Sequence, residues 1–176
     1  MDLKKLYEER HEILSAIEEE FTKEFVPAKL SERDGYNVEF LTVLLEEVAV
    51  DGLTSTGEFF FLPNKEGEEI QYFVNLITIS EELPDDTMNE LCAAVASINT
   101  YVMTGAFAVD PVAGTLVYKH AYEMPIDLPK EQVADFVDMT MGITIQMVQQ
   151  YAYYLIEVKE GKRTAKNVVL SLSPLE

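Results

Sequence analysis

A stretch of the chain without any formal charge, from Leu91 to Val109, limits the possible folds more than any other feature. Charged residues make up 26% of the sequence, so a gap of this length indicates a segment in the protein interior. We expect a buried helix that ends near Ile98 and Asn99, a turn region through Gly105, and then a buried strand. The single cysteine, Cys92, lies inside the stretch and is predicted to be a small buried residue in a reducing compartment.

The start and the end of this helix have sequence signals of their own. Thr87 precedes Glu90 by three residues, which is the spacing of a capping box, so a helix is predicted to begin there. Its predicted buried side consists of Leu91, Val95, Ile98 and Val102. Asparagine tolerates the left-handed conformation at a helix end and can bond the adjacent backbone, and glycine accepts a positive φ. Asn99 and Gly105 are therefore predicted to have a structural role in the turn.

Apolar residues at three- and four-residue spacing also dominate the N-terminal segment. They alternate with glutamates, and the pattern predicts an amphipathic helix over residues 2–25. Pro27 is predicted to end this helix, because the residue before a proline is pushed out of the helical region. Residues 31–35 are expected to form a polar connector. The acidic triplet 18–20 is interpreted as a solvated helix face.

Three β-strands with short connections are predicted between the two helices. They cover residues 37–50, 58–62 and 70–79. The first of them also fits a helix face, and we favour a strand because the turn residues Asp51 and Gly52 and then an aromatic-rich run follow it. Together the three strands predict an antiparallel meander, one face of which needs a cover.

A second β unit is predicted after Gly105. Residues 106–109 and 115–122 are expected to form the two strands of a hairpin, with turn residues between them. His120 lies in its second strand and His11 in the first helix, and neither has another histidine or a cysteine at metal-ligand spacing. We therefore expect no metal site and no cofactor.

The longest predicted helix covers residues 129–158 and contains a second uncharged stretch, residues 139–156. The length of this stretch would suit a membrane span. Gln146, Gln149 and Gln150 would be costly in hydrocarbon, however, so we expect no membrane insertion.

This helix has two apolar lines on different faces, and one sheet can cover only one of them. The second line consists of Met141, Ile145, Val148, Ala152 and Ile156. It is the candidate interface, since it could bury the N-terminal helix or a second subunit, and methionine suits an adaptable contact surface. A homodimer is predicted on this basis.

The last part of the chain, residues 159–176, is first basic and then apolar. Cations at a helix C-terminus interact favourably with the helix dipole, which accounts for the basic residues. The apolar part could pair as an edge strand or remain without regular structure, and the sequence leaves both open. A chain of 176 residues fits a single domain, with an N-terminal helix and linker at 1–30, a core at 37–158 and this tail.

The charge of the chain narrows the classes of partner. Thirteen basic and 32 acidic residues give a formal net charge of −19 at pH 7, which repels phosphate backbones and anionic membrane surfaces. Nucleic acid is therefore not expected as a partner. The first residues lack the apolar core and cleavage site of a secretory signal, and we expect a cytoplasmic protein.

The order of the elements from residue 37 to 158 resembles that of the bacterial YbjN-type family, which has the type III secretion chaperone-like fold. The residues that carry the resemblance are 73–79, Leu91, Ile98, Asn99, Gly105, Phe107, Leu116, Tyr118 and the final helix. The resemblance implies an α+β fold in which helices cover one face of an antiparallel sheet, with the N-terminal helix as an addition. Secretion chaperones of this fold are small, acidic, dimeric and non-enzymatic, and YbjN-type proteins are loosely described as regulators. The family supplies no catalytic residue.

Two hypotheses for function follow. The first is a non-enzymatic, chaperone-like module for protein binding or regulation, which recognises a protein partner through apolar grooves or an exposed sheet edge. The alternative is a small-ligand binder, or a hydrolase that uses an acidic pair in a cleft. The sequence has no nucleotide-binding, metalloprotease or nucleophile-elbow motif, so the first hypothesis is favoured.

Overall fold

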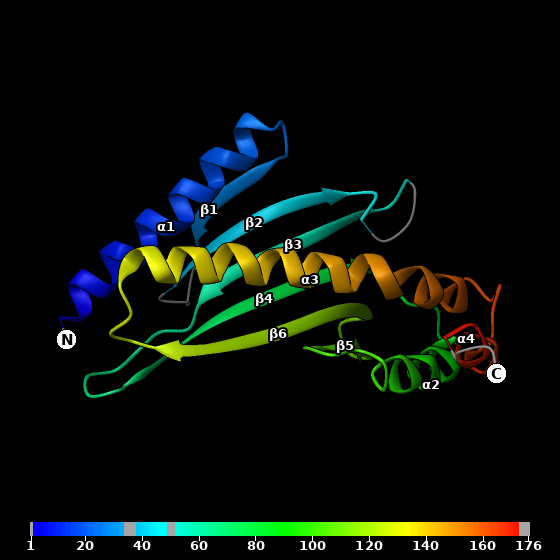
Figure 1. Cartoon of the computed structure of the whole chain (residues 1–176). Coiled ribbons are helices and arrows are strands. Elements are labelled where there is room, and N and C mark those ends of the chain that lie inside the picture. The colour runs from blue at the N-terminus through cyan, green and yellow to red at the C-terminus, as the bar shows by residue number, and fades with distance from the viewer. Residues whose placement is uncertain (1, 34–37, 49–51, 173–176) are drawn as a thin grey trace. The chain divides into compact units, whose positions relative to one another are not determined.

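The computed structural model describes residues 2–33, 38–48 and 52–172 (Figure 1). In chain order the elements are α1 (Leu3–Lys23), β1 (Ala28–Glu32), β2 (Glu39–Glu46), β3 (Thr54–Phe61), β4 (Ile70–Ser80), α2 (Met88–Ile98), β5 (Ala106–Asp110), β6 (Thr115–Pro125), α3 (Lys130–Lys159) and α4 (Ala165–Leu172). The strands form a six-stranded sheet in the order β1-β2-β3-β4-β6-β5. The predicted α+β class and antiparallel sheet are confirmed.

The chain divides into two compact units. Unit 1 comprises the described residues of 1–45, 56–76 and 121–143, and unit 2 those of 46–55, 77–120 and 144–176. The division passes through β2, β3, β4, β6 and α3, so each of these elements contributes to both units.

Helix α1 in unit 1 ends earlier than the sequence predicts. The Asp2 side chain caps its start by accepting a hydrogen bond from the backbone N–H of Lys4. At its end Phe25 adopts a left-handed φ of 62°, and the N–H of Val26 donates to the carbonyl of Phe21 at 2.9 Å. The helix therefore stops at Lys23 through a left-handed cap, and the prediction that Pro27 ends it is wrong.

Strand β1 occupies part of the segment that was expected to be a connector. It pairs antiparallel with β2, with Leu30 opposite Leu41, and α1 packs beside it (Figure 1). Short strands with charged residues are typical of sheet edges, and their alternation is weak in the sequence. The predicted strand over 37–50 is confirmed as β2, whereas Asp51 of the predicted turn lies outside the described residues.

Helices cover one face of the strands in unit 1. Gln71 and Asn75 are four residues apart on β4 and therefore point to the same face. Gln71 bonds to Arg10 of α1, and the Asn75 side-chain amide donates to the carbonyl of Thr140 of α3 at 3.0 Å. The core on this face includes Leu41, Val43, Phe59, Phe73 and Val137, all fully buried. Tyr72, next to Gln71 on β4, points to the opposite face and is 39% exposed.

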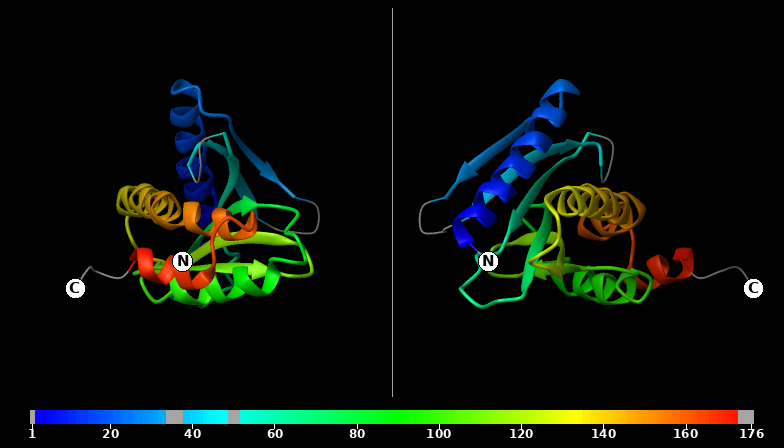
Figure 2. Two further views of the ribbon diagram at one scale, coloured as in Figure 1. Left: turned by 90° about the vertical axis from the view of Figure 1, so that its right-hand side faces the viewer. Right: turned by 60° about the vertical axis from the view of Figure 1, so that its left-hand side comes forward.

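In unit 2 the last helix of the chain, α4, packs against α2. Helix α4 lies beside α2 in both views of Figure 2, and its Ala165 and Val168 are buried. The tail, for which a strand or irregular structure was left open, is thus helical over 165–172. Its apolar residues recur at helical spacing, and α2 provides the surface on which they pack.

The predicted capping box of α2 is absent, although both of its residues are in use. Thr87 is the N-cap, but its side chain makes no cap hydrogen bond and instead donates to the carbonyl of Lys159 at 3.1 Å. The Glu90 carboxylate accepts from the backbone N–H of Ala165 at 2.6 Å, at the start of α4. These two residues therefore connect α2 to the end of α3 and the start of α4.

The uncharged stretch from Leu91 to Val109 is only partly buried. The buried side of α2 consists of Leu91, Ala94, Val95 and Ile98. Cys92 is exposed, and the side chain of Met103 is 85% exposed, so the prediction of a buried cysteine is wrong. Lack of charge did not imply burial here, because a helix with small residues on its outer side still faces water with that side.

Candidate functional site

Most of the predicted interface on the last helix is inside the folded chain. Met141, Val148, Ala152 and Ile156 are buried, and Ile145 is half-buried. Both apolar lines of α3 therefore pack within the chain, and only Ile145 of the five presents part of its surface to a partner. Contact with a second subunit through this line remains a prediction, restricted to the exposed part of Ile145.

Asn99 and Gly105 lie where α2 passes into the β5–β6 hairpin. Asn99 caps α2 in a right-handed conformation, with φ −61°, rather than the left-handed one that was expected. Its side-chain amide donates to the carbonyl of Phe107 and accepts from the N–H of Phe107, both at 2.9 Å. Gly105 has a φ of 66°, and a Cβ there would lie 2.5 Å from the Tyr118 hydroxyl. Asn99 thus acts as a partner for the backbone of β5.

The same device protects the edge strand in unit 1. The Glu18 carboxylate accepts a hydrogen bond from the backbone N–H of Leu30 on β1 at 2.9 Å. Glu18 belongs to the acidic triplet that was interpreted as a solvated face. The strands at both ends of the sheet order, β1 and β5, therefore have backbone groups occupied by helix side chains, which opposes strand addition at Leu30 and Phe107.

A buried arginine is the most unusual polar residue of unit 1. Arg10 of α1 is only 4% exposed, and its guanidinium lies 4.8 Å from the ring centre of Phe61 and 5.5 Å from that of Tyr7. Its Nε and Nη2 donate to the Gln71 side-chain oxygen at 3.2 and 3.1 Å, and Nη2 also donates to the Asn64 side-chain oxygen at 2.5 Å. We call Arg10, Gln71 and Asn64 the Arg10 cluster.

The acceptors of the Arg10 cluster are all uncharged. The fourth hydrogen bond runs from Nη1 to the backbone carbonyl of Leu62 at 3.2 Å. Burial disfavours the cationic form and lowers the pKa of Arg10 to about 10, partly offset by the nearby Tyr7. Arg10 therefore stays protonated at neutral pH as a buried cation without a carboxylate among its bonded partners.

The Arg10 cluster borders a cavity of about 270 Å³. The cavity is lined by Tyr7, Arg10, Leu14, Glu32, Val38, Glu39 and Phe61. Four of these seven residues are aromatic or aliphatic and three are charged, a mixture that is usual for small-molecule sites. We call it the Arg10 cavity.

Two carboxylates lie at the rim of the Arg10 cavity. Glu39 accepts or shares hydrogen bonds with His11 at 2.9 and 3.1 Å, and Glu32 is exposed. A hydrolase of the kind considered above needs a carboxyl group whose pKa is raised by burial, so that it stays protonated and can act as a general acid. Neither of these two glutamates is buried, so the described lining of the cavity offers no such pair.

Sequence reasoning missed Arg10, although a signal for it exists. Arg10 lies four residues after Leu6 and four before Leu14, and both leucines are buried on α1. An arginine in the middle of an apolar line of a helix is either a snorkelling side chain or a buried functional cation. Its partners could not be found in the same way, because Asn64 and Gln71 are more than 50 residues away in the chain.

An exposed apolar surface lies on the β3–β4 hairpin of unit 1. Leu62, Ile70 and Tyr72 are 38 to 39% exposed, and the N–H of Leu62 donates to the carbonyl of Tyr72 at 2.9 Å. An open groove of about 420 Å³ runs along them, lined by Leu62, Pro63, Asn64, Glu68, Glu69, Ile70 and Tyr72. We call this groove and its lining the hairpin surface.

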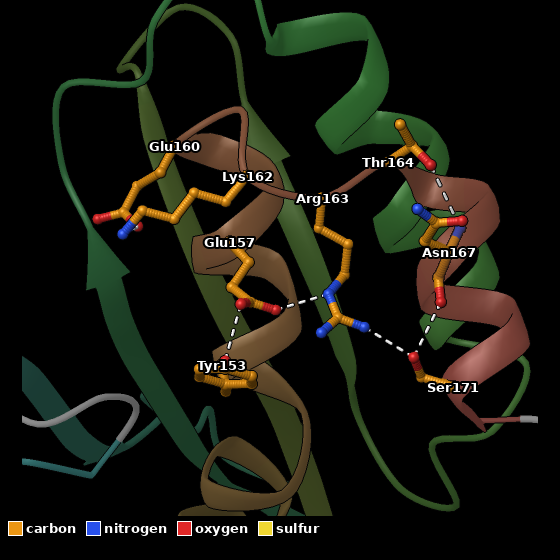
Figure 3. A network of polar contacts seen from close by, with 8 residues as sticks. All are labelled: Tyr153, Glu157, Glu160, Lys162, Arg163, Thr164, Asn167 and Ser171. Atoms are coloured by element: carbon orange, nitrogen blue, oxygen red, sulfur yellow. Dashed lines mark hydrogen bonds and ion pairs between the residues drawn. The ribbon is translucent and has the colours of Figure 1, made fainter.

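A polar network in unit 2 joins the end of α3 to α4 (Figure 3). The Glu157 carboxylate accepts from the Tyr153 hydroxyl at 2.7 Å and from Nε of Arg163 at 2.5 Å. Nη1 of Arg163 donates to the Ser171 hydroxyl at 2.7 Å, and the guanidinium lies over the Tyr154 ring. The hydrogen bond from Tyr153 has the largest effect on the pKa of Glu157. Desolvation, the second largest effect, raises this pKa, and the hydrogen bond from Arg163 lowers it again, so that it lies below its usual range.

Among the described residues, no group of three or more histidine, cysteine, aspartate or glutamate side chains is arranged to hold a metal ion. Within the same part of the chain, no helix combines the length and the apolar character needed to cross a bilayer.

Several solved structures are similar to this chain, two of which are the following. YbjN from E. coli, a proposed transcription regulator, shares 13% sequence identity with it, and the match covers 78% of this chain and 89% of YbjN with a TM-score of 0.41. An uncharacterized protein from Methanothermobacter thermautotrophicus shares 11% identity, with 82% of this chain and 97% of that protein covered and a TM-score of 0.43. No protein-family model and no curated protein matches the sequence. YbjN, whose family the sequence resembles, is thus among the proteins with a fold similar to this one.

Proposed function

We propose that this chain is a non-enzymatic protein-binding module that recognises a protein partner through the hairpin surface. The observation that supports it best is the grouping of three partly exposed apolar side chains, Leu62, Ile70 and Tyr72, along one open groove. Apolar side chains that gather on one face are typical of interaction sites, whereas singly scattered ones are not. Tyrosine is also among the residues that contribute most to binding at interfaces.

The alternative way to bind a polypeptide, strand addition at a sheet edge, has less support. It needs a row of free backbone groups. Glu18 and Asn99 occupy such groups at Leu30 of β1 and Phe107 of β5. Recognition by the sheet face is therefore favoured over recognition by its edges.

Charge indicates the chemistry of the partner. The hairpin surface is flanked by Glu68 and Glu69, and the chain as a whole has a net charge of −19. We expect a partner segment with apolar residues flanked by lysine or arginine, because opposite charges speed association and exclude acidic competitors. Binding should weaken as ionic strength rises.

The test uses a photo-crosslinking residue, benzoylphenylalanine, placed at Tyr72 in the full chain expressed in its native cell. The matched control carries the same residue at Tyr153, which is 45% exposed but belongs to unit 2. We expect a crosslinked protein from position 72 that is absent from position 153 and is lost when Leu62 and Ile70 are changed to serine. Equal crosslinking from both positions, or none from position 72, would contradict the proposal.

Homodimerisation is a separate proposal, which rests on the predicted line of α3. Because four residues of that line are buried, a dimer contact there would centre on Ile145. Light scattering should give a mass near twice 19.9 kDa, and Ile145→Asp should lower it to that of one chain. A monomer in the unsubstituted protein would remove this proposal and leave the hairpin surface unaffected.

A further inference from the structure

The positive charge of Arg10 has no anion among its hydrogen-bond partners in the Arg10 cluster. Moving a cation out of water is costly, and buried cations are generally paired with an anion. Arg10 is 4% exposed, and its four hydrogen bonds go to two amide side chains and one backbone carbonyl. This occurs in a chain with 32 acidic residues, so carboxylates are not scarce.

One donor of Arg10 is also left over. A guanidinium has five N–H groups, and the four hydrogen bonds use Nε, both hydrogens of Nη2 and one hydrogen of Nη1. The second Nη1 hydrogen has no acceptor among the residues that the structure describes. Arg10 lines the Arg10 cavity, where a ligand oxygen could supply both the acceptor and the negative charge.

The rest of the cavity is suited to other parts of a ligand. Tyr7, Phe61 and Leu14 form an apolar wall that would hold a hydrocarbon or aromatic body. Glu32 and Glu39, the two carboxylates of the lining, are less buried than Arg10 and would attract a cation while repelling a second anion. Glu39 already has His11 as a partner, so Glu32 is the carboxylate with the most freedom to bind.

We propose that the Arg10 cavity binds a free amino acid with an aromatic or large aliphatic side chain, whose carboxylate meets Arg10 and whose ammonium meets Glu32. The proposal goes beyond the protein-binding function, since it concerns a different site and a different class of ligand. A purely anionic ligand would face the two rim glutamates, and a purely cationic one would face Arg10. A zwitterion is complementary to both ends, and about 270 Å³ is enough for one residue of this size.

The experiment titrates the full chain by calorimetry with L-phenylalanine and with two analogues that each lack one charge. N-acetyl-L-phenylalanine has no ammonium, and phenethylamine has no carboxylate. Loss of one charge-assisted hydrogen bond should weaken binding by about 10-fold or more, so both analogues should bind worse than phenylalanine. Equal binding of all three compounds would overturn the proposal, as would no binding of phenylalanine at millimolar concentration.

Variants then test which residues meet each charge. Gln71→Glu places a carboxylate beside Arg10 within the protein, so it should weaken phenylalanine by about 10-fold while folding is checked by circular dichroism. Glu32→Gln, at an exposed position, should weaken the binding of phenylalanine but not that of N-acetyl-L-phenylalanine, which has no ammonium to lose its partner. Glu19→Gln is the matched control, because it removes the same charge from an exposed site on α1 outside the cavity lining.

The outcomes separate clearly. A weaker affinity in Gln71→Glu and Glu32→Gln, with no change in Glu19→Gln, supports the assigned orientation. The same affinity in all three variants overturns it. The Tyr72 crosslink is a readout at the hairpin surface, so failure of this proposal does not affect that of the protein-binding function.

Discussion

Two arginines, one in each unit, join a helix to a neighbouring segment in opposite ways. Arg10 of α1 is buried, lies near Tyr7 and Phe61, and bonds only to uncharged acceptors. Arg163, between α3 and α4, has a side chain 23% exposed, lies over Tyr154 and pairs with the Glu157 carboxylate. The buried arginine is thus held by hydrogen bonds to uncharged acceptors, whereas the arginine near the surface is held by an ion pair.

The two arginines should therefore contribute differently to the free energy of folding. An ion pair near water gains little, because both charges were well solvated before folding. The acceptors of the buried Arg10 are shielded from bulk water, so removing their donor leaves them without a hydrogen-bond partner. Arg10 should therefore matter far more to the stability of unit 1 than Arg163 matters to unit 2.

The largest effect is expected for Arg10→Ala. It leaves the side-chain oxygens of Gln71 and Asn64 and the Leu62 carbonyl without their donor, and should lower the free energy of unfolding by about 3 to 5 kcal/mol. Urea unfolding followed by circular dichroism measures this. Lys5→Ala, at an exposed position of the same helix, serves as the control and should change little. If Arg10→Ala lowered the free energy of unfolding no more than Lys5→Ala, the buried arginine would not contribute more to stability than an exposed cation.

A smaller loss is expected for Gln71→Leu. The Gln71 amide accepts two hydrogen bonds from Arg10 and donates one to the Pro125 carbonyl at 3.2 Å. Its removal should cost about 2 to 3 kcal/mol, because the guanidinium keeps its other two acceptors. The double variant with Arg10→Ala should lose less than the sum of the two single losses, as residues of one network do. Additive losses in the same urea experiment would show that the two side chains act independently.

Arg163→Ala should have a modest effect. Loss of the ion pair with Glu157 and of the hydrogen bond to Ser171 should lower the free energy of unfolding by about 1 kcal/mol, and less at high salt. Urea titrations at low and high sodium chloride measure both quantities. If the loss matched that of Arg10→Ala and did not depend on salt, the two arginines would be equivalent.

The smallest effect is the pH dependence of that last difference. The pKa of Glu157 is held below its ordinary value of 4.5, so its contribution to stability is present above about pH 4.5 and is lost as pH falls through the lower folded-state pKa. The difference between wild type and Arg163→Ala should shrink over that range. The Arg10→Ala difference should stay constant there, because none of the bonded partners of Arg10 titrates. Unfolding curves from pH 7 down to pH 3 test this contrast.

The elements with strong periodicity were predictable from the sequence. The long helix over 129–158 and the hairpin after Gly105 are present as α3 and β5–β6, since their patterns extend over many residues. The candidate site was not predictable in the same way. Arg10 stands out on its helix, but its acceptors come from β4 and the loop before it, and no local pattern links them.

The failed predictions share a physical cause. Thr87 and Glu90 have the spacing of a capping box, yet α4 and the end of α3 compete for the same side chains. Glu18, in an apparently solvated triplet, is used by the edge of β1. Side chains with several possible partners bond to whichever the fold brings near, so their roles depend on distant segments.

The sequence by itself determined the class of fold, the order of most elements and the acidity that selects among partners. These properties follow from local spacing and from composition, which do not depend on what packs against what. Only the tertiary structure decided that the second apolar line of α3 is mostly buried, that both edge strands are capped by helix side chains, and that a cation without an anion lines a cavity. Burial and pairing are properties of two surfaces meeting, and neither surface alone contains that information.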